Sequence, residues 1–519
     1  MHSAILSDYL LQHFDRQSAV PGNQQLYRLL RKAILTRVLP PDARLPSSRE
    51  LSSELVVCRN TVLYAYQQLL AEGFVEGRSG SGTFVIDTTP NMPSMPSASS
   101  MHGNPAKAML ERKKAALEAP SLSRRGHELV DHAGASHQQW GPFVPGVPDV
   151  TLFPHALWSR LQAKAWRKPS PDALTYAQGG GYMPLRESLA EYLKIARSVE
   201  CLPEQVVVTA GIHQSIDLSL RLLSDPGDLA WVEDPGYWGT RNLLRASGLR
   251  IRPIALDGDG MCPSDADLAH VPRFIFVTPS HQYPLGSVMG LARRRQLLEY
   301  AKQHGCWIVE DDYDSEFRYN GKPLLSLQGM DSANRVLYMG TFSKTMFPGL
   351  RLGFMVLPLA LVKPFVTGVN ELHRAGNVLT QAALAEFINQ GFFASHVRRM
   401  RGVYAARLRL LQGLIDDRYG AGEIRVSGSD AGLHLVLQLP PYCDDRAIAR
   451  EAEQAGIGVR PLSSYYMVPA SAPRGLLLGY GGVAEGEIAA AFAILAEVID
   501  GHLQPLRKAA RNQLGVGVC

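Results

Sequence analysis

The sequence predicts a multidomain protein with a small N-terminal α+β unit, a linker and a large C-terminal α/β domain. The chain has 519 residues, whereas a single hydrophobic core stops growing at about 250–300 residues. Up to about residue 85, segments with helical apolar spacing end in a hairpin pattern. From about residue 140 onward, short runs rich in Val and Ile alternate with helical segments, which is typical of a parallel sheet buried on both faces.

The composition and charge are those of an ordinary soluble protein. The formal net charge is +5, a mildly basic balance that tolerates an acidic partner without requiring one. The 6 cysteines are scattered without a CxxC pair or metal-like spacing, which suits a reducing compartment. The N-terminus lacks a signal-peptide pattern, and the longest apolar run is too short and too broken by proline to span a bilayer. We therefore expect a cytoplasmic protein with no metal site and no membrane partner.

Residues 1–85 show the element order of a winged helix-turn-helix domain. The segment "QQLYRLLRKAILTRVLPP" has helical spacing and ends at a Pro-Pro pair. A second helix is expected in "LPSSRELSSEL", capped by Ser47 or Ser48 with Glu50 in its first turn, and a third in "VVCRNTVLYAYQQLLAEGF". The following "FVEGRSGSGTFV" predicts two short strands around a Gly/Ser turn. In this plan the third helix enters the DNA major groove by its N-terminal end.

Polar side chains fall where such a domain meets DNA. The start of the third helix can reach base edges or phosphates, and the second helix and the loop before it can reach the DNA backbone. The turn glycines let the hairpin approach phosphates closely. Taken singly, each arginine is more commonly a solvated surface residue, but their order along the motif favours DNA binding. The expected DNA-binding residues are Arg44, Arg49, Arg59, Asn60, Thr61 and Arg78.

The middle of the chain, residues 86–139, is expected to be a linker. Its first part, "DTTPNMPSMPSASSMHGNP", is rich in Pro, Ser and Met and cannot bury a core. The next part, "AKAMLERKKAALEA", is compatible with a short solvated helix. We predict that residues 140–519 form one domain, with a large lobe over about 140–393 and a small α+β lobe over about 394–519. Its clearest strand segments are "QVVVTAG", "LAWVEDPG", "FIFVTPS", "CWIVEDD" and "RVLYMG".

A single lysine, Lys344, follows the last of these strands in the polar, glycine-rich segment "TFSKTMFPGLRLG". Most lysines are solvated surface residues. An amine at a strand end, with its pKa lowered by cationic and apolar surroundings, can form a Schiff base with an aldehyde. Thr341, Ser343 and Arg351 lie near it in sequence and offer donors to a phosphate. Ligands of doubly wound sheets bind at these strand ends.

Three other motifs point to the same cofactor, pyridoxal 5'-phosphate (PLP). The strand-Gly-helix segment "VVVTAGIHQ" presents free N–H groups at Gly211 and Ile212, although many such turns look alike. Tyr237 in "EDPGYWG" can stack on a flat ring, or it can be a core tyrosine. Asp311 in "CWIVEDDYDSEF" needs a cationic partner, and a protonated pyridine nitrogen is one. Tyr313 can then bond the ring's phenolic oxygen, while Asp312 and Asp314 are expected to be solvated or helix-capping carboxylates.

These motifs carry two resemblances. "RLPSSRELSSELVVCRNTVLYAYQQLLAEGFVEGRSGSGTFV" resembles the GntR family of bacterial regulators. "TFSKTMFPGLRLGF", "EDDYDSEFRY", "PSHQYPLG" and "EDPGYWGTRNLL" resemble the fold-type I aminotransferase superfamily, and the whole chain except the linker resembles the MocR-type branch of the GntR regulators. The resemblance implies that Lys344 forms the internal aldimine, Asp311 pairs with the pyridine nitrogen and Tyr237 stacks on the ring. It implies phosphate contacts from Gly211, Ile212, Ser343 and Arg351.

The sequence departs from these families at three places. Leu63 stands where many GntR members carry an operator-reading arginine, so no operator sequence can be transferred. Tyr283-Pro284 replaces the Asn-Pro of aminotransferases, so His281, Gln282 or Tyr283 is expected to contact the ring oxygen. Leu477 stands where enzymes typically place an arginine that grips the substrate carboxylate. Arg460 is the candidate replacement and Arg474 the alternative, and the competing interpretation of Arg460 is a surface ion pair.

The missing carboxylate arginine favours sensing over turnover, because its loss weakens amino-acid binding. We interpret the chain as a PLP-dependent, DNA-binding transcriptional regulator that senses PLP, or an amine or amino acid, through an aldimine at Lys344. The resemblance implies a head-to-tail homodimer bound to double-stranded operator DNA. One alternative is a working aminotransferase with a DNA-binding appendage, and another is a vestigial domain that only dimerises the winged helix. Multiple turnover with an amino donor and a 2-oxo acid separates the first alternative from a sensor.

Overall fold

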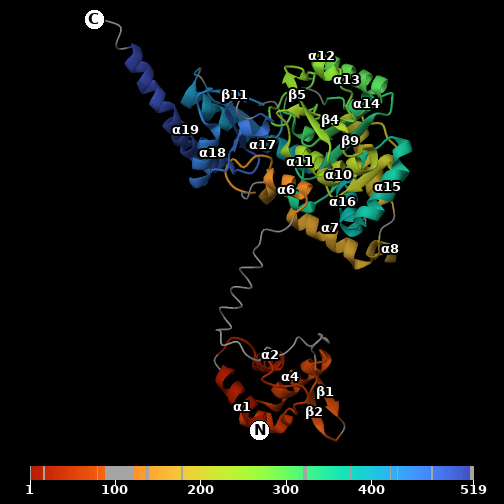
Figure 1. The fold of residues 1–519 in the computed structure, drawn as a ribbon, viewed down its shortest axis with the longest axis vertical. Coiled ribbons are helices and arrows are strands. Elements are labelled where there is room, and N and C mark those ends of the chain that lie inside the picture. The colour runs from red at the N-terminus through yellow and green to blue at the C-terminus, as the bar shows by residue number, and fades with distance from the viewer. Residues whose placement is uncertain are drawn as a thin grey trace. The chain divides into compact units, whose positions relative to one another are not determined.

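A computed structural model gives the fold of the chain (Figure 1). It describes residues 2–15, 18–78, 80–87, 122–134, 139–176, 179–319, 324–374, 376–420, 422, 424–428, 431–468 and 472–514. The helix expected in "AKAMLERKKAALEA" lies outside these residues. The chain divides into two compact units, residues 1–120 and 121–519. No helix in the described ranges is long and apolar enough to cross a membrane.

The N-terminal unit has the predicted three helices and hairpin. They are α2 (Gly22–Leu35), α3 (Ser48–Glu54), α4 (Arg59–Ala71), β1 (Val75–Arg78) and β2 (Gly82–Val85). Ser47 caps α3 in a capping box, in which the Ser47 side chain accepts from the Glu50 N–H and the Glu50 carboxylate accepts from the Ser47 N–H. An additional helix, α1 (His2–His13), was not predicted; its Leu6 and Leu10 are buried in the core of this unit. Their spacing of four residues was the available signal.

An eight-stranded sheet forms the centre of the second unit, with strand order β3-β10-β9-β8-β7-β4-β5-β6. The five strand segments singled out in the sequence form β3, β4, β7, β8 and β9, as predicted. β10 and β6 are antiparallel to their neighbours, and the rest of the sheet is parallel. The strands are β3 (Val206–Thr209), β4 (Leu229–Asp234), β5 (Arg250–Asp257), β6 (Gly260–Met261), β7 (Phe274–Val277), β8 (Trp307–Asp312), β9 (Val336–Thr341) and β10 (Gly353–Val356).

The sheet is buried on both faces. Alternate residues of β3 enter different hydrophobic clusters, Val206 and Val208 on one side and Val207 on the other. This burial explains why the strand is a continuous run of valine rather than an alternating pattern. The helices of this lobe are α6 (Arg124–Asp131), α7 (His155–Arg167), α8 (Pro171–Leu174), α9 (Met183–Arg197), α10 (Ile212–Leu223), α11 (Trp238–Ala246), α12 (Asp265–Leu268), α13 (Leu291–His304), α14 (Leu327–Met330), α15 (Leu359–His373) and α16 (Val378–Asn389).

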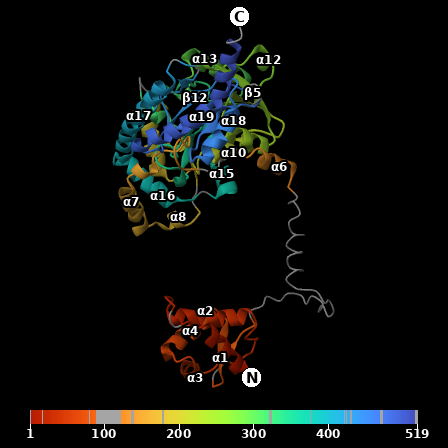
Figure 2. The ribbon, with the colours of Figure 1, turned by 90° about the vertical axis from the view of Figure 1, so that its left-hand side faces the viewer.

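The small lobe is a second, antiparallel sheet covered by helices (Figure 2). Its strand order is β11-β12-β14-β13, and α17 packs against α19 beside it. The elements are α17 (Phe392–Tyr419), β11 (Arg425–Ser427), β12 (His434–Gln438), α18 (Asp445–Gln454), β13 (Arg460–Pro461), β14 (Gly475–Gly479) and α19 (Glu485–Leu514). The predicted mixture of helices and alternating strands is therefore present.

Helix α6 lies within the segment that was predicted to be linker, and it packs on the large lobe. It contacts α11. The Asn242 side chain of α11 donates a hydrogen bond of 2.8 Å to the His132 carbonyl, just after α6. Gly134 lies so close to Trp238 that a Cβ on the glycine would be 2.7 Å from the indole ring. The chain that leaves the linker is thus anchored to the first two turns of α11.

Candidate functional site

The predicted cofactor residues come together at one edge of the eight-stranded sheet. β3, β4, β8 and β9 are parallel, so their carboxyl ends meet there. Gly211 follows β3, Tyr237 follows β4 and Lys344 follows β9. Asp311 is the penultimate residue of β8. β10 begins at the same edge, and Arg351 lies just before it. The order of strands, rather than closeness in sequence, assembles the site.

Lys344 has its amine inside the protein. The Lys344 Nζ donates a hydrogen bond of 2.6 Å to the Gly146 carbonyl. Burial lowers the pKa of the Lys344 amine, and Asp314 and Asp311 partly oppose that effect. A lowered pKa increases the fraction of neutral amine, which is the form that attacks an aldehyde.

Asp311 presents a buried carboxylate oxygen without a protein partner. Its Oδ1 is buried and forms no hydrogen bond in the described structure. Burial, followed by repulsion from Asp312, raises the pKa of Asp311 to about 7, and Lys344 opposes this rise. Buried polar atoms are almost always paired, so an unpaired carboxylate oxygen at a strand end indicates a missing cationic or protonated partner.

The expectation for Asp312 was wrong. Because successive residues of a strand face opposite sides of the sheet, Asp312 points away from Asp311. It lies 2.6 Å from the Arg197 Nε, with both side chains at most 5% exposed, and it accepts a bond of 2.5 Å from the Tyr338 hydroxyl. Asp312 is therefore a buried ion-pair partner and not a solvated or capping carboxylate.

Tyr237 is the residue immediately before α11 and faces the same space as Asp311. Both residues line a pocket with about 390 Å³ of empty volume, part of it open to solvent. The Tyr237 hydroxyl lies 2.9 Å from His213 Nε2, at the start of α10. The Tyr237 ring is thereby fixed beside the carboxylate, where a flat aromatic ligand can stack on it.

The proposed phosphate contacts converge at the start of α10. Gly211 precedes the helix and carries no capping side chain, so the first N–H groups of α10 are available to an anion. Gly353 approaches the Gly211 Cα so closely that a Cβ on Gly353 would lie 2.9 Å from it. The exposed Arg351 lies two residues before Gly353, and its charge, after burial, lowers the pKa of His213. The other contacts are Ile212, the first residue of α10, and the hydroxyls of Thr341 and Ser343, which lie 3.1 Å apart.

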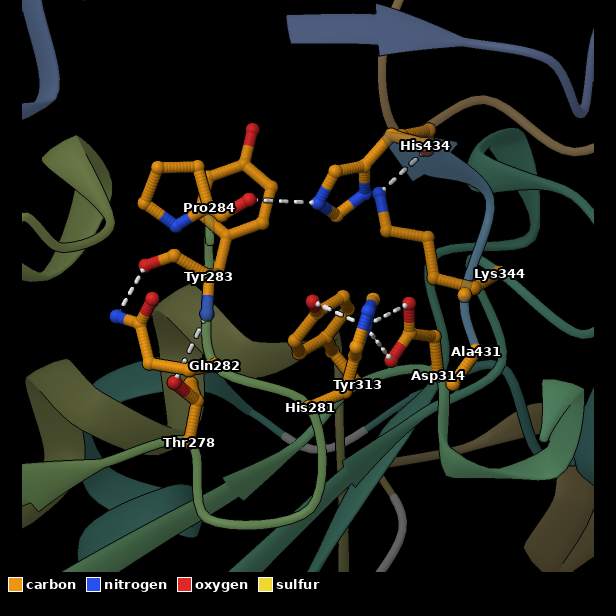
Figure 3. A network of polar contacts seen from close by, with 12 residues as sticks. Thr278, His281, Gln282, Tyr283, Pro284, Tyr313, Asp314, Lys344, Ala431 and His434 are labelled. Carbon is orange, nitrogen blue, oxygen red and sulfur yellow. Dashed lines mark hydrogen bonds and ion pairs between the residues drawn. The ribbon is translucent and has the colours of Figure 1, made fainter. Parts of the chain in front are cut away.

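Of the three candidates for the ring-oxygen contact, two are engaged elsewhere. The Gln282 amide donates to the carbonyls of Pro235 and Tyr283 at 2.9 and 2.7 Å. The Tyr283 hydroxyl lies 3.1 Å from the Tyr465 hydroxyl. The third, His281, stands beside Tyr313, whose hydroxyl is 2.9 Å from His281 Nδ1 (Figure 3).

Asp314 was also expected to be solvated or capping, and this was wrong. Its oxygens lie 3.0 and 3.1 Å from His281 Nδ1, and both side chains are nearly inaccessible to solvent, at 2% and 1%. Figure 3 shows Asp314 and Tyr313 meeting at His281, with His434 next to Lys344. His434 Nε2 lies 3.1 Å from the Pro284 carbonyl. The sequence signal for this group was the polar triplet before Tyr283, but nothing local pairs it with Asp314 or His434.

The candidate effector end lies where β13 meets β14. Arg460 is directly opposite Leu477 in this antiparallel pair, and directly opposed residues share one face of a sheet. Arg460 therefore stands next to the position that lacks the enzyme arginine, and its charge counteracts the raised pKa values of Tyr283 and Tyr465. Arg474 lies 3.7 Å from the buried Asp445. Of the two arginines, Arg460 is the one that lies opposite Leu477.

These residues fit a PLP group. An amine with a lowered pKa, an unpaired buried carboxylate, a tyrosine face and a glycine-capped helix start are the four features that the aldehyde, pyridine nitrogen, ring and phosphate require. The strand ends that carry them meet at one edge of the sheet. Among the residues that the structure describes, no cluster of three or more His, Cys, Asp or Glu could hold a metal ion.

In the N-terminal unit, the predicted DNA-binding residues lie on α4, on α3 and on the wing. The first turn of α4 contains Arg59, Asn60 and Thr61. The Arg59 Nε donates a hydrogen bond of 3.2 Å to the Ser48 hydroxyl at the start of α3. Arg44 and Arg49 are exposed before and within α3. Arg78 is already paired, at 2.6 Å with Asp42 and 2.7 Å with Glu76.

Arg59→Ala is expected to weaken binding to a specific DNA duplex by about 1–3 kcal/mol, because a guanidinium at the start of the inserted helix can reach bases or phosphates. Arg78→Ala is expected to weaken DNA binding clearly less than Arg59→Ala does, because Asp42 and Glu76 compete with phosphate for that guanidinium. Fluorescence anisotropy at two salt concentrations measures both variants. An equal loss for the two variants would show that the wing arginine is not held back by its carboxylates.

Two family models match the chain. Residues 23–85 match bacterial regulatory proteins of the gntR family, and residues 155–475 match aminotransferase class I and II. The class I and II aminotransferase family is PLP-dependent, and a GntR-type domain binds DNA.

Curated relatives contain both parts in one chain. The probable rhizopine catabolism regulatory protein MocR of Rhizobium meliloti is 40% identical over 473 residues, covering 90% of this chain and 92% of the relative. The HTH-type pyridoxine biosynthesis transcriptional regulator PdxR of Corynebacterium glutamicum is 30% identical over 479 residues, covering 92% of this chain and 95% of the relative.

Solved aminotransferases share the fold of the C-terminal domain. The kynurenine aminotransferase of Pyrococcus horikoshii matches with a TM-score of 0.64 and 25% identity over 77% of this chain and 100% of the enzyme. The alpha-aminoadipate aminotransferase LysN of Thermus thermophilus matches with a TM-score of 0.63 and 26% identity over 73% of this chain and 95% of the enzyme. The chain therefore belongs to the MocR-type branch of the GntR family of transcriptional regulators, in which a DNA-binding winged helix is joined to an aminotransferase-like domain.

Proposed function

We propose that this regulator holds PLP covalently on Lys344 and uses it to sense PLP itself or an amine. The observation that carries the proposal is the buried Oδ1 of Asp311, which has no hydrogen-bond partner in the described structure. Asp311 and Tyr237 line the same pocket, and Lys344 follows a strand that ends at the same edge of the sheet. When bound, the cofactor would supply an electrophilic aldehyde and an electron-withdrawing ring. Asp311 would hold the proton of the ring nitrogen. Gly211, Ile212, Thr341, Ser343 and Arg351 would bind the phosphate.

The amine effector would displace the Lys344 amine from the cofactor. Arg460 would bind a carboxylate on the effector, as its place opposite Leu477 supports. A Lys344 amine that is not bonded to the cofactor would be held by the Gly146 carbonyl, to which it donates in the structure. The effector would therefore be an amino acid or another amine that carries an anionic group.

The assembly and location follow from the same proposal. A homodimer, arranged head-to-tail, would present two winged helices to a two-fold symmetric operator, since half-sites mirror protein symmetry. A regulator that binds operator DNA would act in the cytoplasm. Size-exclusion chromatography with light scattering tests the dimer directly.

The alternative, an active aminotransferase with a DNA-binding appendage, uses the same Lys344, Asp311 and Tyr237. Leu477 in place of an arginine disfavours it, because losing a charged clamp weakens carboxylate binding by about 1.5–3 kcal/mol. The test is production of keto acid from an amino donor and a 2-oxo acid, run beside binding of DNA from the region upstream of its own gene. A sensor shows no multiple turnover, with no more than about one keto acid per site, and changes its DNA affinity with the amine. Sustained product formation would establish the enzyme.

The anchored segment after the linker offers a route from the pocket to the DNA-binding unit. Tyr237, the proposed stacking residue, is followed directly by Trp238, against which Gly134 packs. Asn242, one turn further along α11, holds the His132 carbonyl. A shift of α11 on effector binding would therefore move the chain segment that leads to the linker.

Asn242→Ala is expected to reduce the effect of the amine on DNA affinity at least about threefold while cofactor binding stays unchanged, because the bond that ties α11 to the segment after α6 is lost. Anisotropy with and without amine measures the coupling, and absorbance measures the cofactor. Gln303→Ala, which removes an exposed amide on α13, serves as control. Full coupling in Asn242→Ala would exclude this route.

A further inference from the structure

His281 Nδ1 lies within hydrogen-bond distance of both Tyr313 and Asp314, and it cannot donate to one of them while it accepts from the other. The Tyr313 hydroxyl lies 2.9 Å away, and the Asp314 oxygens lie 3.0 and 3.1 Å away. An imidazole nitrogen either carries a proton and donates, or lacks it and accepts, whereas a carboxylate only accepts. With Asp314 as a carboxylate, Nδ1 carries the proton and donates it toward Asp314.

This tautomer decides what the Tyr313 hydroxyl can do. The oxygen of Tyr313 faces an N–H group, so it can only accept from His281, and its own proton has to point to another acceptor. If Nδ1 lacked a proton, the phenol would donate to the imidazole and be unavailable. Asp314 thus controls the direction of the phenol proton through His281.

The backbone around His281 leaves room for the ring and little else. A Cβ on Gly432 would overlap the His281 ring, and a Cβ on Gly286 would lie 3.1 Å from His281 Nε2. The Gly432 carbonyl is held in turn by the hydroxyls of Tyr480, at 2.9 Å, and Tyr319, at 2.5 Å. The imidazole therefore packs so closely against the Gly432 backbone of the small lobe that only a glycine leaves room for the ring there.

We propose that Asp314 and His281 are positioning residues that turn the Tyr313 hydroxyl proton toward the phenolic oxygen of the cofactor. The inference rests on the proposed function, because Tyr313 needs that oxygen as its acceptor. A donor at this oxygen stabilises its ionised form. Tyr283, which stands in place of the asparagine, bonds to Tyr465, so the hydroxyl of Tyr313 is left as the donor to this oxygen.

Several other titratable groups lie near His281 and Tyr313. The His434 ring lies 5.3 Å from the His281 ring and 5.3 Å from the Tyr283 ring. The pKa of Tyr313 is raised by burial and, after it, by the charged and phenolic neighbours Asp314, Tyr283, Asp311 and Glu233. The test therefore compares variants at one site in a fixed background, so that these neighbours contribute equally to both.

The experiment measures the pH dependence of the visible absorbance of PLP bound to the full-length protein. His281→Gln places its amide near the Nε2 position and removes the donor at Nδ1, whereas the shorter His281→Asn keeps an N–H donor near Nδ1. We expect the absorbance midpoint to rise by about one pH unit in His281→Gln, roughly a tenfold change, and to stay near the wild-type value in His281→Asn. In a Tyr313→Phe background, His281→Gln should add no further shift.

The outcomes separate this inference from the proposed function. If His281→Gln titrates like the wild type, or shifts the midpoint equally in the Tyr313→Phe background, the positioning role is wrong although PLP is bound. If His281→Asn shifts as far as His281→Gln, the ring fills space and does not direct a proton. If the wild type forms no visible band and no borohydride-reducible adduct with PLP, the proposed function fails and this inference with it.

Discussion

Lys344→Ala is expected to leave DNA binding intact and to abolish every response of that binding to PLP or to an amine. The Lys344 amine is the group in the proposed site that bonds covalently to an aldehyde, and without it PLP is held by non-covalent contacts alone. The N-terminal unit has its own hydrophobic core, so its fold does not depend on Lys344. The measurement is anisotropy of a labelled operator fragment, titrated with protein in the presence and absence of PLP and candidate amines.

The matched control is Lys363→Ala, which removes an exposed lysine on α15. It is expected to retain the wild-type response and the wild-type visible absorbance. A Lys344→Ala protein that still responds to an amine would show that sensing does not pass through a covalent bond. A loss of DNA binding itself, with the fold intact by circular dichroism, would show that the cofactor is part of the DNA-binding state.

Asp311→Asn is expected to act in opposite directions on cofactor binding and on the stability of the cofactor-free protein. The amide cannot accept the ring-nitrogen proton as a carboxylate does, and the loss of a charge-assisted hydrogen bond costs about 1.5–3 kcal/mol, or about 10- to 150-fold in PLP affinity. In the free protein the substitution removes a buried carboxyl that is costly to ionise. We expect the free energy of unfolding of the cofactor-free protein to rise by on the order of 1–2 kcal/mol at about pH 8.

The pH dependence fixes the sign of that second effect. The folded-state pKa of Asp311 is raised to about 7 from an ordinary 3.8, so the folded protein binds the proton more tightly than the unfolded chain does. The stability contributed by the protonated carboxyl is complete below about pH 4 and is lost as the pH rises through about 7. The gain in Asp311→Asn should therefore be present at about pH 8 and vanish near about pH 4.

Chemical denaturation of cofactor-free protein at both pH values, together with PLP titrations, checks the two signs. Asp417→Asn, an exposed carboxylate on α17, is the control and should change neither quantity by more than about 0.5 kcal/mol. An Asp311→Asn protein that is less stable at the higher pH would mean that the carboxylate has a structural partner. Unchanged PLP affinity would show that Asp311 does not contact the cofactor.

The positions of the strand ends and helix starts could be predicted from the sequence, because they depend on local patterns. The valine run of β3, the capping box at Ser47 and the lysine after β9 are all visible within a few residues. What the sequence could not supply were contacts between distant segments. Asp312 looks like a surface carboxylate until Arg197, 115 positions earlier, is placed beside it. Asp314 and His281 are brought together by neighbouring strands in the same way.

The small lobe shows the same limit at the candidate effector site. Arg460 and Leu477 are well separated in sequence, and only the register of β13 against β14 sets them opposite each other. Helix α6 falls within residues 86–139, which were predicted to be linker, and none of its residues is buried. Its position is instead fixed by one amide on α11 and by a glycine that fits against Trp238.

Borohydride reduction of the purified protein incubated with PLP, followed by peptide mass spectrometry, tests the central claim most directly. A covalent bond between the cofactor aldehyde and Lys344 predicts one pyridoxyl group per chain, located on the peptide that contains Thr341 to Arg351. A pyridoxyl group on another lysine, or none at all at saturating PLP, would contradict the account and leave a DNA-binding regulator with a different trigger.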